Sequence, residues 1–483
     1  MARTGWARTG GGPDGAGQDQ AGADLPAADQ ASGDSTSTDV ASTDVASTDG
    51  AAADTTAAKK PCSSGLELFA KDHDNGGDEG AYAMVATADG GVLLLGGNGN
   101  GGSSSNALAV RVSPAGGVVW AKELGGADMD RFRGGAAAAN GAVAVGSTRS
   151  PTNGLDDGWL VHLDSSGKAG LDQHYGGASN DEFLGIAAAP GGWVMAGSTR
   201  SLGNGQEEGW LVRVDAKGQL LWQQNYGGTS IDTLAAVIAL PNGNFAAVGE
   251  NSSSAKQGSD AWLLIVQGDG KPLISKTYHM GEHDYATAVA ALPDGGLILT
   301  GEASANGNPE LWVARTDAEG NQLWKDVVTG NQAETGRAVS VLADGGWAVA
   351  GDSSSSNPGS LGGIDGWLLR YDAWGNRMWN KHFGSNGNEW FSAIAAPADG
   401  GLWLGGRRWA SGGLNTWYLR VNAWGHSSCA AAGLCKDKLA SDCQDALPCT
   451  LDDCDPSAGC SHPALQAGSA CGAGQLCTAS GCQ

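Results

Sequence analysis

The hydrophobic and polar positions between Asp74 and Gly425 repeat one pattern seven times, with a period of about 50 residues. In each copy a short apolar run ends at a turn of the type Pro/Ala-x-Gly-Gly, and a second apolar run follows. A polar loop rich in Ser, Asn and Gly leads to a third run, and an Asp-x-x-Gly hairpin leads to a fourth. Four short strands per repeat are typical of a propeller blade.

The copy between Asp181 and Gly228 shows the pattern most clearly. Its first apolar run covers residues 184–189, its third run begins at Trp210, and its fourth run contains Trp222. One glycine closes the second run in every copy, and we call it the repeat glycine: Gly96, Gly146, Gly197, Gly249, Gly301, Gly351 and Gly406. We therefore predict an all-β protein whose main domain is a seven-bladed β-propeller.

The last repeat lacks its fourth strand, because a polar segment follows Gly425. The missing strand is expected at the other end of the repeats, where residues 65–71 match the spacing of a fourth strand without a gap. Closing the ring in this way removes free sheet edges. It also places Cys62 beside Cys429, and we predict a disulfide between them that stabilises the fold by about 5 kcal/mol in the chain-entropy description.

Composition divides the 483 residues into three predicted regions. Residues 1–61 are a low-complexity segment with an aspartate at every fifth position from 14 to 54, which predicts a disordered linker, with calcium binding as the alternative. Residues 62–428 are predicted to form the propeller, and the 80 glycines, 18 tryptophans and 17% charged residues of the whole chain indicate short strands and tight turns. Residues 429–483 are expected to form a small disulfide-rich module of unknown connectivity.

Charge and cysteine placement indicate the environment of the protein. The formal charge of −24 opposes binding to nucleic acid or to an anionic membrane surface, and no apolar stretch is long enough for a transmembrane segment. Nine of the ten cysteines lie between Cys429 and Cys482 without a Cys-x-x-Cys pair, which favours disulfides in an oxidising compartment. The first residues lack an apolar signal region, so we expect an export signal or a lipid anchor upstream of Met1. The expected location is extracellular or on the outer cell surface.

The repeat also resembles known proteins. Its Gly-Gly-Trp, Asp/Glu-Gly-Trp-Leu and Tyr-Gly-Gly elements resemble the propeller repeats of secreted and surface proteins of Gram-negative bacteria, and residues 447–463 resemble cysteine-rich repeats in myxobacterial surface proteins. The Asp215-x-x-Gly218-x-x-x-Trp222 element is similar to the tryptophan-docking motif of quinoprotein propellers. Its Asp-to-Gly spacing is one residue shorter, however, and the adjacent cysteine pair of those enzymes does not occur. The resemblance therefore implies a surface protein and argues against a quinone cofactor.

One face of the propeller is expected to carry the function, because the loops between the second and third strands vary from repeat to repeat. Two sets of carboxylates lie on this variable face. The ring acids stand at the start of each first strand: Glu79, Asp130, Asp181, Asp232, Asp284, Glu334 and Glu389. The second-set acids stand two residues before the third-strand tryptophan: Asp157, Glu208, Asp260, Glu310 and Asp365. The ring acids either accept backbone N–H groups and fix their turns, or hold Ca²⁺.

Departures from the repeat supply the ligand-binding candidates. Aromatic residues follow several ring acids, and an Arg-Arg-Trp segment replaces the usual serine-rich loop of the last repeat. The candidates are Tyr285, Trp390, Phe391, Arg407, Arg408 and Trp409. They could contact a sugar or a peptide, although packing between blades would use the same aromatic residues. The segment from His279 to His283 matches a zinc-peptidase pattern, but that chemistry requires a helix, and a turn is expected here.

These observations favour a non-catalytic binding or adhesion scaffold on the cell surface or in the medium, with a protein, peptide or glycan ligand. One alternative is an extracellular enzyme that acts on polysaccharide, with Glu389 and either Asp181 or Asp232 as acid and base. A structural spacer is the other alternative. No residue is assigned a catalytic role on the first hypothesis.

Overall fold

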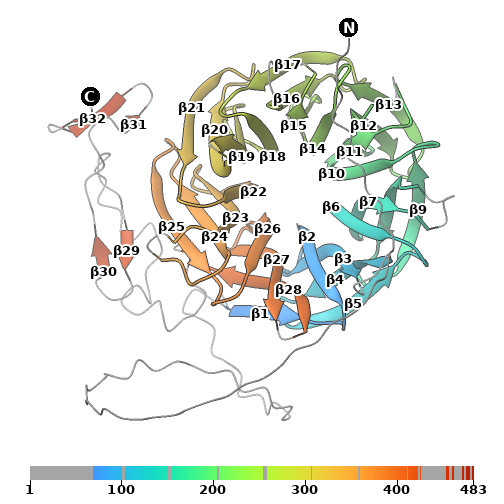
Figure 1. Ribbon diagram of the computed structural model, residues 1–483, viewed down its shortest axis with the longest axis horizontal. Helices are drawn as coiled ribbons and strands as arrows, with labels where there is room; N and C mark the ends of the chain where they lie inside the picture. Colours follow the sequence, from blue (N-terminus) through green and yellow to red (C-terminus); the bar gives the residue numbers. More distant parts are fainter. Residues whose placement is uncertain are drawn as a thin grey trace, which may run out of the picture. The chain divides into compact units, whose positions relative to one another are not determined.

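The strands of the chain form a seven-bladed β-propeller (Figure 1). The computed structural model describes residues 69–425, apart from 100–103, 151–154, 204–205, 254–257, 306, 357–358, 411 and 423–424, and five short strands in the tail. Each blade is a four-stranded antiparallel sheet. In six blades the strands follow one another in sequence with the first strand nearest the centre of the ring, and in the seventh the outer strand is β1. The architecture predicted from the repeat is therefore confirmed.

The strands are grouped by their position in the blade. The inner strands are β2 (Asp78–Ala86), β6 (Asp130–Ala138), β10 (Asp181–Ala189), β14 (Asp232–Ala239), β18 (His283–Ala291), β22 (Glu334–Val341) and β26 (Glu389–Ala395). The second strands are β3 (Val92–Gly99), β7 (Gly141–Thr148), β11 (Gly192–Thr199), β15 (Phe245–Asn251), β19 (Leu297–Ala305), β23 (Trp347–Ser353) and β27 (Leu402–Ala410). The third strands are β4 (Ser105–Val112), β8 (Asp157–Leu163), β12 (Glu208–Asp215), β16 (Asp260–Val266), β20 (Asn308–Thr316), β24 (Asp365–Tyr371) and β28 (Gly413–Val421). The outer strands are β5 (Val118–Leu124), β9 (Ala169–Tyr175), β13 (Leu220–Tyr226), β17 (Pro272–Tyr278), β21 (Gln322–Val328), β25 (Arg377–Phe383) and β1 (Phe69–His73).

The repeat glycine is explained by a bulge in the inner strand. In the blade of β10, the register with β11 shifts between Phe183 and Gly185, and the carbonyl of Glu182 points at Gly197. A Cβ atom on Gly197 would lie 1.8 Å from that carbonyl oxygen. Across the seven blades the corresponding distance is 1.7 to 2.0 Å. Only glycine fits where a neighbouring backbone approaches this closely.

Aromatic residues fill the spaces between successive blades. Phe183 stacks on Trp210 of its own blade with ring centroids 4.7 Å apart, and both rings are fully buried. They press against Gly158 of the preceding blade, where a Cβ would meet both rings within 3.0 Å. Equivalent stacked pairs join Phe132 to Trp159 and Phe391 to Trp417. Such pairs add about 0.5–1.5 kcal/mol each beyond the area they bury.

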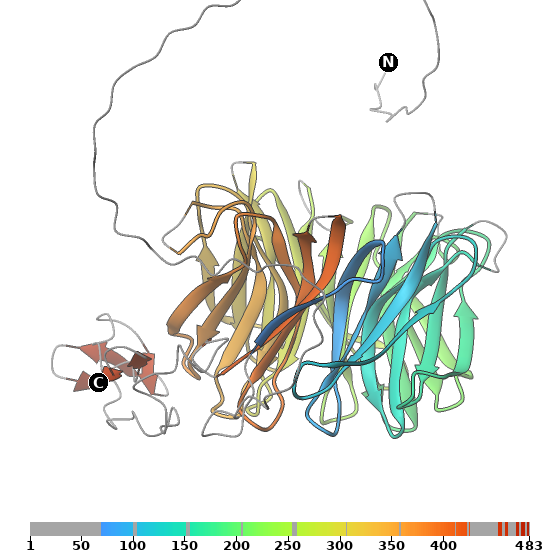
Figure 2. The ribbon, with the colours of Figure 1, turned by 90° about the horizontal axis from the view of Figure 1, so that it is seen from below.

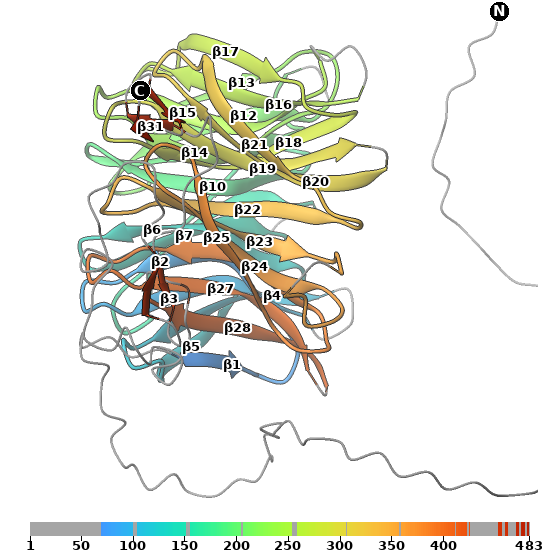
Figure 3. The same ribbon diagram turned by 90° about the vertical axis from the view of Figure 1, so that its left-hand side faces the viewer.

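The N-terminal strand closes the last blade, as the sequence predicts. Strand β1 pairs with β28 in antiparallel register, from Phe69 opposite Arg420 to His73 opposite Thr416, and the two strands lie side by side in both side views (Figures 2 and 3). Phe69 makes edge contacts with Trp403 and with the more distant Tyr418. The observed strand begins and ends later than the predicted segment, residues 65–71, whose first four residues lie outside the described part of the chain.

The described residues of the tail form five short strands. They are β29 (Asp453–Asp455), β30 (Gly459–Ser461), β31 (Ala470–Gly472), β32 (Gln475–Thr478) and β33 (Gly481–Cys482), which form a two-stranded and a three-stranded sheet. The predicted linker of residues 1–61 and the predicted Cys62–Cys429 disulfide lie outside the described residues. Within the part that the structure describes, no helix has the length and apolar character needed to cross a membrane.

Candidate functional site

The two sets of carboxylates meet in pairs at the junctions between blades. The backbone N–H of Asp181 donates to the carbonyl of Asp156, 2.8 Å away, which directly precedes the second-set acid Asp157. The same bond ties three further ring acids to the third strand of the preceding blade: Asp232 to Glu207, Asp284 to Ser259, and Glu389 to Ile364. The sequence placed both sets on one face but did not pair them, because the pairing depends on contacts between neighbouring blades.

The ring acids are buried beneath their own turns. All seven are at most 1% exposed. Asp181 accepts hydrogen bonds from the amides of Gly177 and Arg200, at 2.9 and 3.2 Å, and from the hydroxyls of Ser201 and Thr199. Both carboxylate oxygens also accept donors in three other ring acids: Asp130, Asp232 and Glu389. These contacts are the ones expected if each ring acid accepts backbone N–H groups and fixes its own turn.

Burial of the ring acids bears on the enzymatic and calcium hypotheses. Glu389, Asp181 and Asp232, the candidate acid and base residues, have no surface that could contact a polysaccharide. N–H and O–H donors already occupy their oxygens, and these donors compete with a bound cation. Glu79, Asp284 and Glu334 differ, because each keeps one buried carboxylate oxygen without a hydrogen bond. Burial raises the pKa of Glu79 to about 7.

The residue after the ring acid distinguishes the blades. This position lies near the start of the inner strand, and the inner strands surround the centre of the ring (Figure 1). Its seven occupants are Gly80, Arg131, Glu182, Thr233, Tyr285, Thr335 and Trp390. Each pairs in register with the residue after the repeat glycine on the second strand: Gly97, Ser147, Ser198, Glu250, Glu302, Asp352 and Arg407. Near-identical scaffolds therefore present seven different pairs of residues.

Arginines gather on one side of this ring, and we call this group the basic arc: Arg131, Arg133 and Arg407, with Tyr82, Glu182 and Trp390. The Arg407 guanidinium lies 4.9 Å from the Trp390 ring, and the Arg133 guanidinium lies 4.6 Å from the Tyr82 ring. Arg131 reaches Glu182 at 3.4 Å. Burial, and then repulsion from Arg131, lowers the pKa of Arg133. Arg133 is thus repelled by Arg131 and Arg407 and attracted by Glu182, in a chain of net charge −24.

Carboxylates gather on the other side, and we call this group the acidic arc: Glu250, Glu302 and Asp352, with Tyr285 and Arg337. Arg337 Nε lies 2.6 Å from Asp352 Oδ1, and burial raises the pKa of Glu302. Burial also raises the pKa of Glu250 to about 7, against the lowering effect of the nearby Ser259 and Tyr285. The charge of the acidic arc therefore varies with pH near neutrality.

The ligand-binding candidates predicted from the sequence divide between these surfaces. Trp390 and Arg407 belong to the basic arc, and Tyr285 belongs to the acidic arc. Arg408 pairs with Asp72 of the closing strand at 2.6 Å. Trp409 is 57% exposed on the same strand, β27. Phe391 is fully buried against Trp417, so the packing alternative applies to it and it offers no surface to a ligand.

A polar cavity of about 200 Å³ lies beside the basic arc, between the blades of β6 and β10. Its lining includes Arg131 and Glu182, together with Arg200 and Glu207, which form an ion pair at 2.7 Å. Reasoning from sequence missed Arg131, Arg133, Glu250, Glu302 and Asp352. Comparing the seven repeats position by position would have found four of them, since they vary beside the ring acid or beside the repeat glycine.

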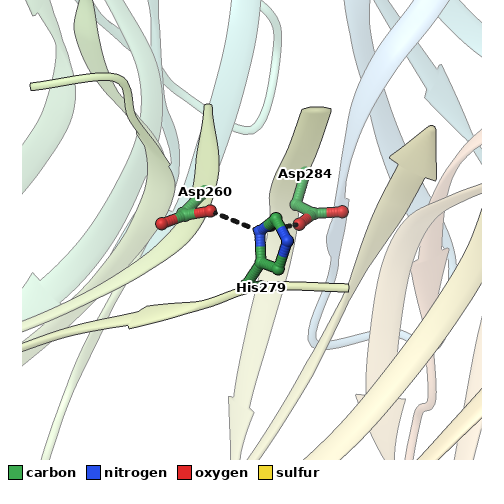
Figure 4. Close-up of side chains that lie close together, drawn as sticks. All are labelled: Asp260, His279 and Asp284. Carbon is green, nitrogen blue, oxygen red and sulfur yellow. Dashed lines mark hydrogen bonds and ion pairs between the residues drawn. The ribbon is translucent and has the colours of Figure 1, made fainter. Parts of the chain in front are cut away.

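A third group lies between the blades of β14 and β18 and contains Asp260, His279 and Asp284 (Figure 4). His279 Nδ1 lies 2.9 Å from Asp260 Oδ1 and 3.7 Å from Asp284 Oδ2. His283, the other histidine of the zinc-peptidase pattern, begins strand β18 and is not part of this group. The pattern therefore does not correspond to a helical zinc site, as the sequence already indicated.

Comparisons with known proteins give structural likenesses only. No protein-family model matches the chain, and no curated protein matches it. The WD40 domain of Pan2 from Neurospora crassa is 10% identical over 74% of this chain and 94% of that chain, with a TM-score of 0.46. YCF48 bound to a D1 peptide is 14% identical over 75% and 97%, with a TM-score of 0.45. Sqt1 from Chaetomium thermophilum, bound to the N-terminus of ribosomal protein L10, is 13% identical over 72% and 88%, with a TM-score of 0.42. Likenesses at this level say nothing of function, and the chain is a seven-bladed β-propeller on the strength of its own strand topology.

Proposed function

We propose that the protein is a non-catalytic binding scaffold that acts outside the cell or on its surface and binds a peptide or protein segment on its variable face. The observation that supports this proposal is the separation of the basic arc from the acidic arc around the axis of the ring. Extracellular placement rests on the cysteine-rich tail and stays a prediction.

A charged, extended ligand fits this surface better than a neutral one. Arginine side chains recognise carboxylates through paired hydrogen bonds, and the acidic arc offers carboxylates to Lys or Arg. The partly exposed Trp390 and Tyr285 add aromatic surface beside each arc. Aromatic and arginine residues carry much of the binding energy in protein interfaces. A peptide with an acidic and a basic portion supplies all of these contacts, whereas a neutral glycan would leave the arginines without a counter-charge.

Selection of short unbiased peptides on the immobilised full chain tests the proposal. We expect the selected peptides to carry acidic residues at one end and basic residues at the other. Their affinity, measured by fluorescence anisotropy, should fall at least tenfold in the Arg407→Ala variant, which corresponds to about 1.4 kcal/mol. It should also fall as salt is raised, because exposed charge pairs are screened.

The Arg377→Ala variant is the matched control. Arg377 has a similar exposure to the arc residues, 37%, but lies on the outer strand β25 and pairs at 3.8 Å with Asp326. Peptides that bind Arg407→Ala and Arg131→Ala as tightly as the unchanged protein would contradict the proposal. A chain that selects no peptide would instead favour the structural spacer.

A further inference from the structure

The turn between β17 and β18 has a residue other than glycine five positions before its ring acid, as do the turns that contain Asp74 and Thr329. His279 occupies the place of a glycine that four other turns share: Gly125, Gly176, Gly227 and Gly384. A Cβ on any of those glycines would lie 2.1 to 2.4 Å from an oxygen of the ring acid. The turn at His279 holds its ring acid differently, with the amides of Met280 and Gly281 both donating to Asp284 Oδ2 at 2.6 and 3.1 Å. This junction therefore places an imidazole where four other junctions have a glycine.

The same junction has also lost its hydroxyl donors. In three other blades the ring acid faces a hydroxyl on the second strand: Asp130 faces Thr148, Asp181 faces Thr199, and Glu334 faces Ser353. The residue opposite Asp284 is Ala303, which is buried and brings no donor. Two residues further on, where Ser150, Ser201 and Ser253 stand in other blades, the sequence has Ala305. Asp284 Oδ1 is consequently buried without a hydrogen bond, in a residue that is 0% exposed.

The three side chains converge from three elements. Asp260 begins β16, His279 lies in the turn after β17, and Asp284 is on β18, and Figure 4 shows the imidazole standing between the two carboxylates. One donor atom from each residue lies within 4.8 Å of the other two. In a tetrahedral site with bonds of about 2.0–2.2 Å, ligand atoms are about 3.4 Å apart. The two distances from His279 Nδ1, 2.9 and 3.7 Å, fall on either side of that value.

We propose that Asp260, His279 and Asp284 bind a divalent transition-metal ion of the Zn²⁺ class. Imidazole nitrogen with carboxylate oxygen suits Zn²⁺ and its neighbours, whereas Ca²⁺ takes six to eight oxygen ligands. Two close carboxylates repel one another, and a divalent cation removes that repulsion. The His279 side chain is 69% exposed, so the ion is reached from solvent and keeps a position for water or for an outside ligand.

Other histidine–carboxylate contacts show what an ordinary ion pair looks like in this protein. His174 forms an ion pair with Asp172, and the buried His382 forms one with Asp365. Among the residues that the structure describes, the group at His279 is the one place where three such ligands converge. At this junction the sequence has His279, Ala303 and Ala305 where the blade of β10 has a glycine and two hydroxyl residues.

Zinc titration of the metal-stripped full chain, followed by calorimetry, tests the site. We expect the His279→Gly variant to bind one equivalent fewer than the unchanged protein, or to bind that equivalent with an affinity lowered more than about 100-fold, since changes outside the ligand shell already cost 10- to 100-fold. Glycine is the residue used at this position in four other turns, so folding should be retained. Asp260→Asn, which preserves size, should have the same effect on binding.

His283→Ala is the matched control, because His283 belongs to the same sequence motif but not to the group. It should bind as the unchanged protein does. The aspartate-rich segment and the tail cysteines are common to all variants, so the difference between variants isolates the site. Titration with Co²⁺ should show a visible absorption band that His279→Gly loses and His283→Ala retains. Equal stoichiometry, affinity and Co²⁺ spectra in the unchanged protein, His279→Gly and Asp260→Asn would overturn the proposal.

Discussion

Adding one methyl group at a repeat glycine should destabilise the propeller strongly. In Gly197→Ala the new Cβ would lie 1.8 Å from Glu182 O, 2.8 Å from Glu182 C and 2.9 Å from Phe183 Cα. These are backbone atoms of the adjacent strand, so no side-chain rotation relieves the contact. The two strands have to separate by more than about 1 Å, in a core whose packing tolerates little change.

The expected cost follows from that displacement. Overpacking a core costs about 1–3 kcal/mol, and losses above about 4–5 kcal/mol are exceptional. Separation also disturbs Phe183, which stacks on Trp210 at 4.7 Å. We expect Gly197→Ala to lower the free energy of unfolding by about 3–4 kcal/mol, although alanine at a permissive site would raise it by about 0.4–1 kcal/mol through the unfolded chain.

Urea unfolding, followed by tryptophan fluorescence, measures this difference. Gly412→Ala is the control, since a Cβ there meets no atom within 4 Å and Gly412 does not have the positive φ that would strain alanine. Its free energy of unfolding should change by no more than about 1 kcal/mol. A loss below about 1 kcal/mol in Gly197→Ala would refute the idea that close backbone approach imposes the repeat glycine.

Two further predictions concern charge and ring closure. Burial raises the pKa of Glu250 from 4.5 to about 7, so between these values the folded state binds more protons than the unfolded state, and stability falls as pH rises through this range. Glu250→Gln should therefore reduce the fall in urea-measured stability between pH 4.5 and pH 7, and an unchanged pH profile would contradict the assigned shift. Phe69→Ala should cost about 2–3 kcal/mol, less than a fully buried Phe, because Phe69 is half-buried against Trp403 and Tyr418. Leu221→Ala is the control, because Leu221 lies on an outer strand and is 56% exposed, and it should change stability by about 0.5 kcal/mol or less. Equal losses of stability in the two variants would contradict the idea that packing of β1 stabilises the ring.

The architecture could be predicted from the sequence because the same pattern of strands and turns recurs in every blade. The turn signals and the repeat glycine are local patterns that recur at one period, and they predict the number of strands. The absence of a fourth strand in the last repeat predicts the closing strand. The spacing that placed residues 65–71 against the last blade led to β1 at Phe69–His73. The sequence did not show that a carbonyl points at each repeat glycine, because the bulge that directs it is a property of strand pairing.

The candidate site was harder to predict, because its parts come from different blades. Trp390 and Phe391 were treated alike, yet alternation along β26 turns one side chain toward the basic arc and the other into the junction with a neighbouring blade. The charge of each arc depends on which residues occupy equivalent positions in the seven repeats. The pairing of Asp260 with Asp284 depends on contact between a third strand and the inner strand of the next blade, and no local pattern reports that contact.

The closing strand also governs when folding can finish. Phe69 pairs with Arg420, so the first strand and the last are joined only after the whole ring has been synthesised. Synthesis starts at the N-terminus, so β1 has no partner strand while the other blades form. Contacts of such long sequence separation form late and slowly, because a large loop has to close first. Ring closure should therefore be the slow step of folding, and unfolding should begin where β1 leaves β28.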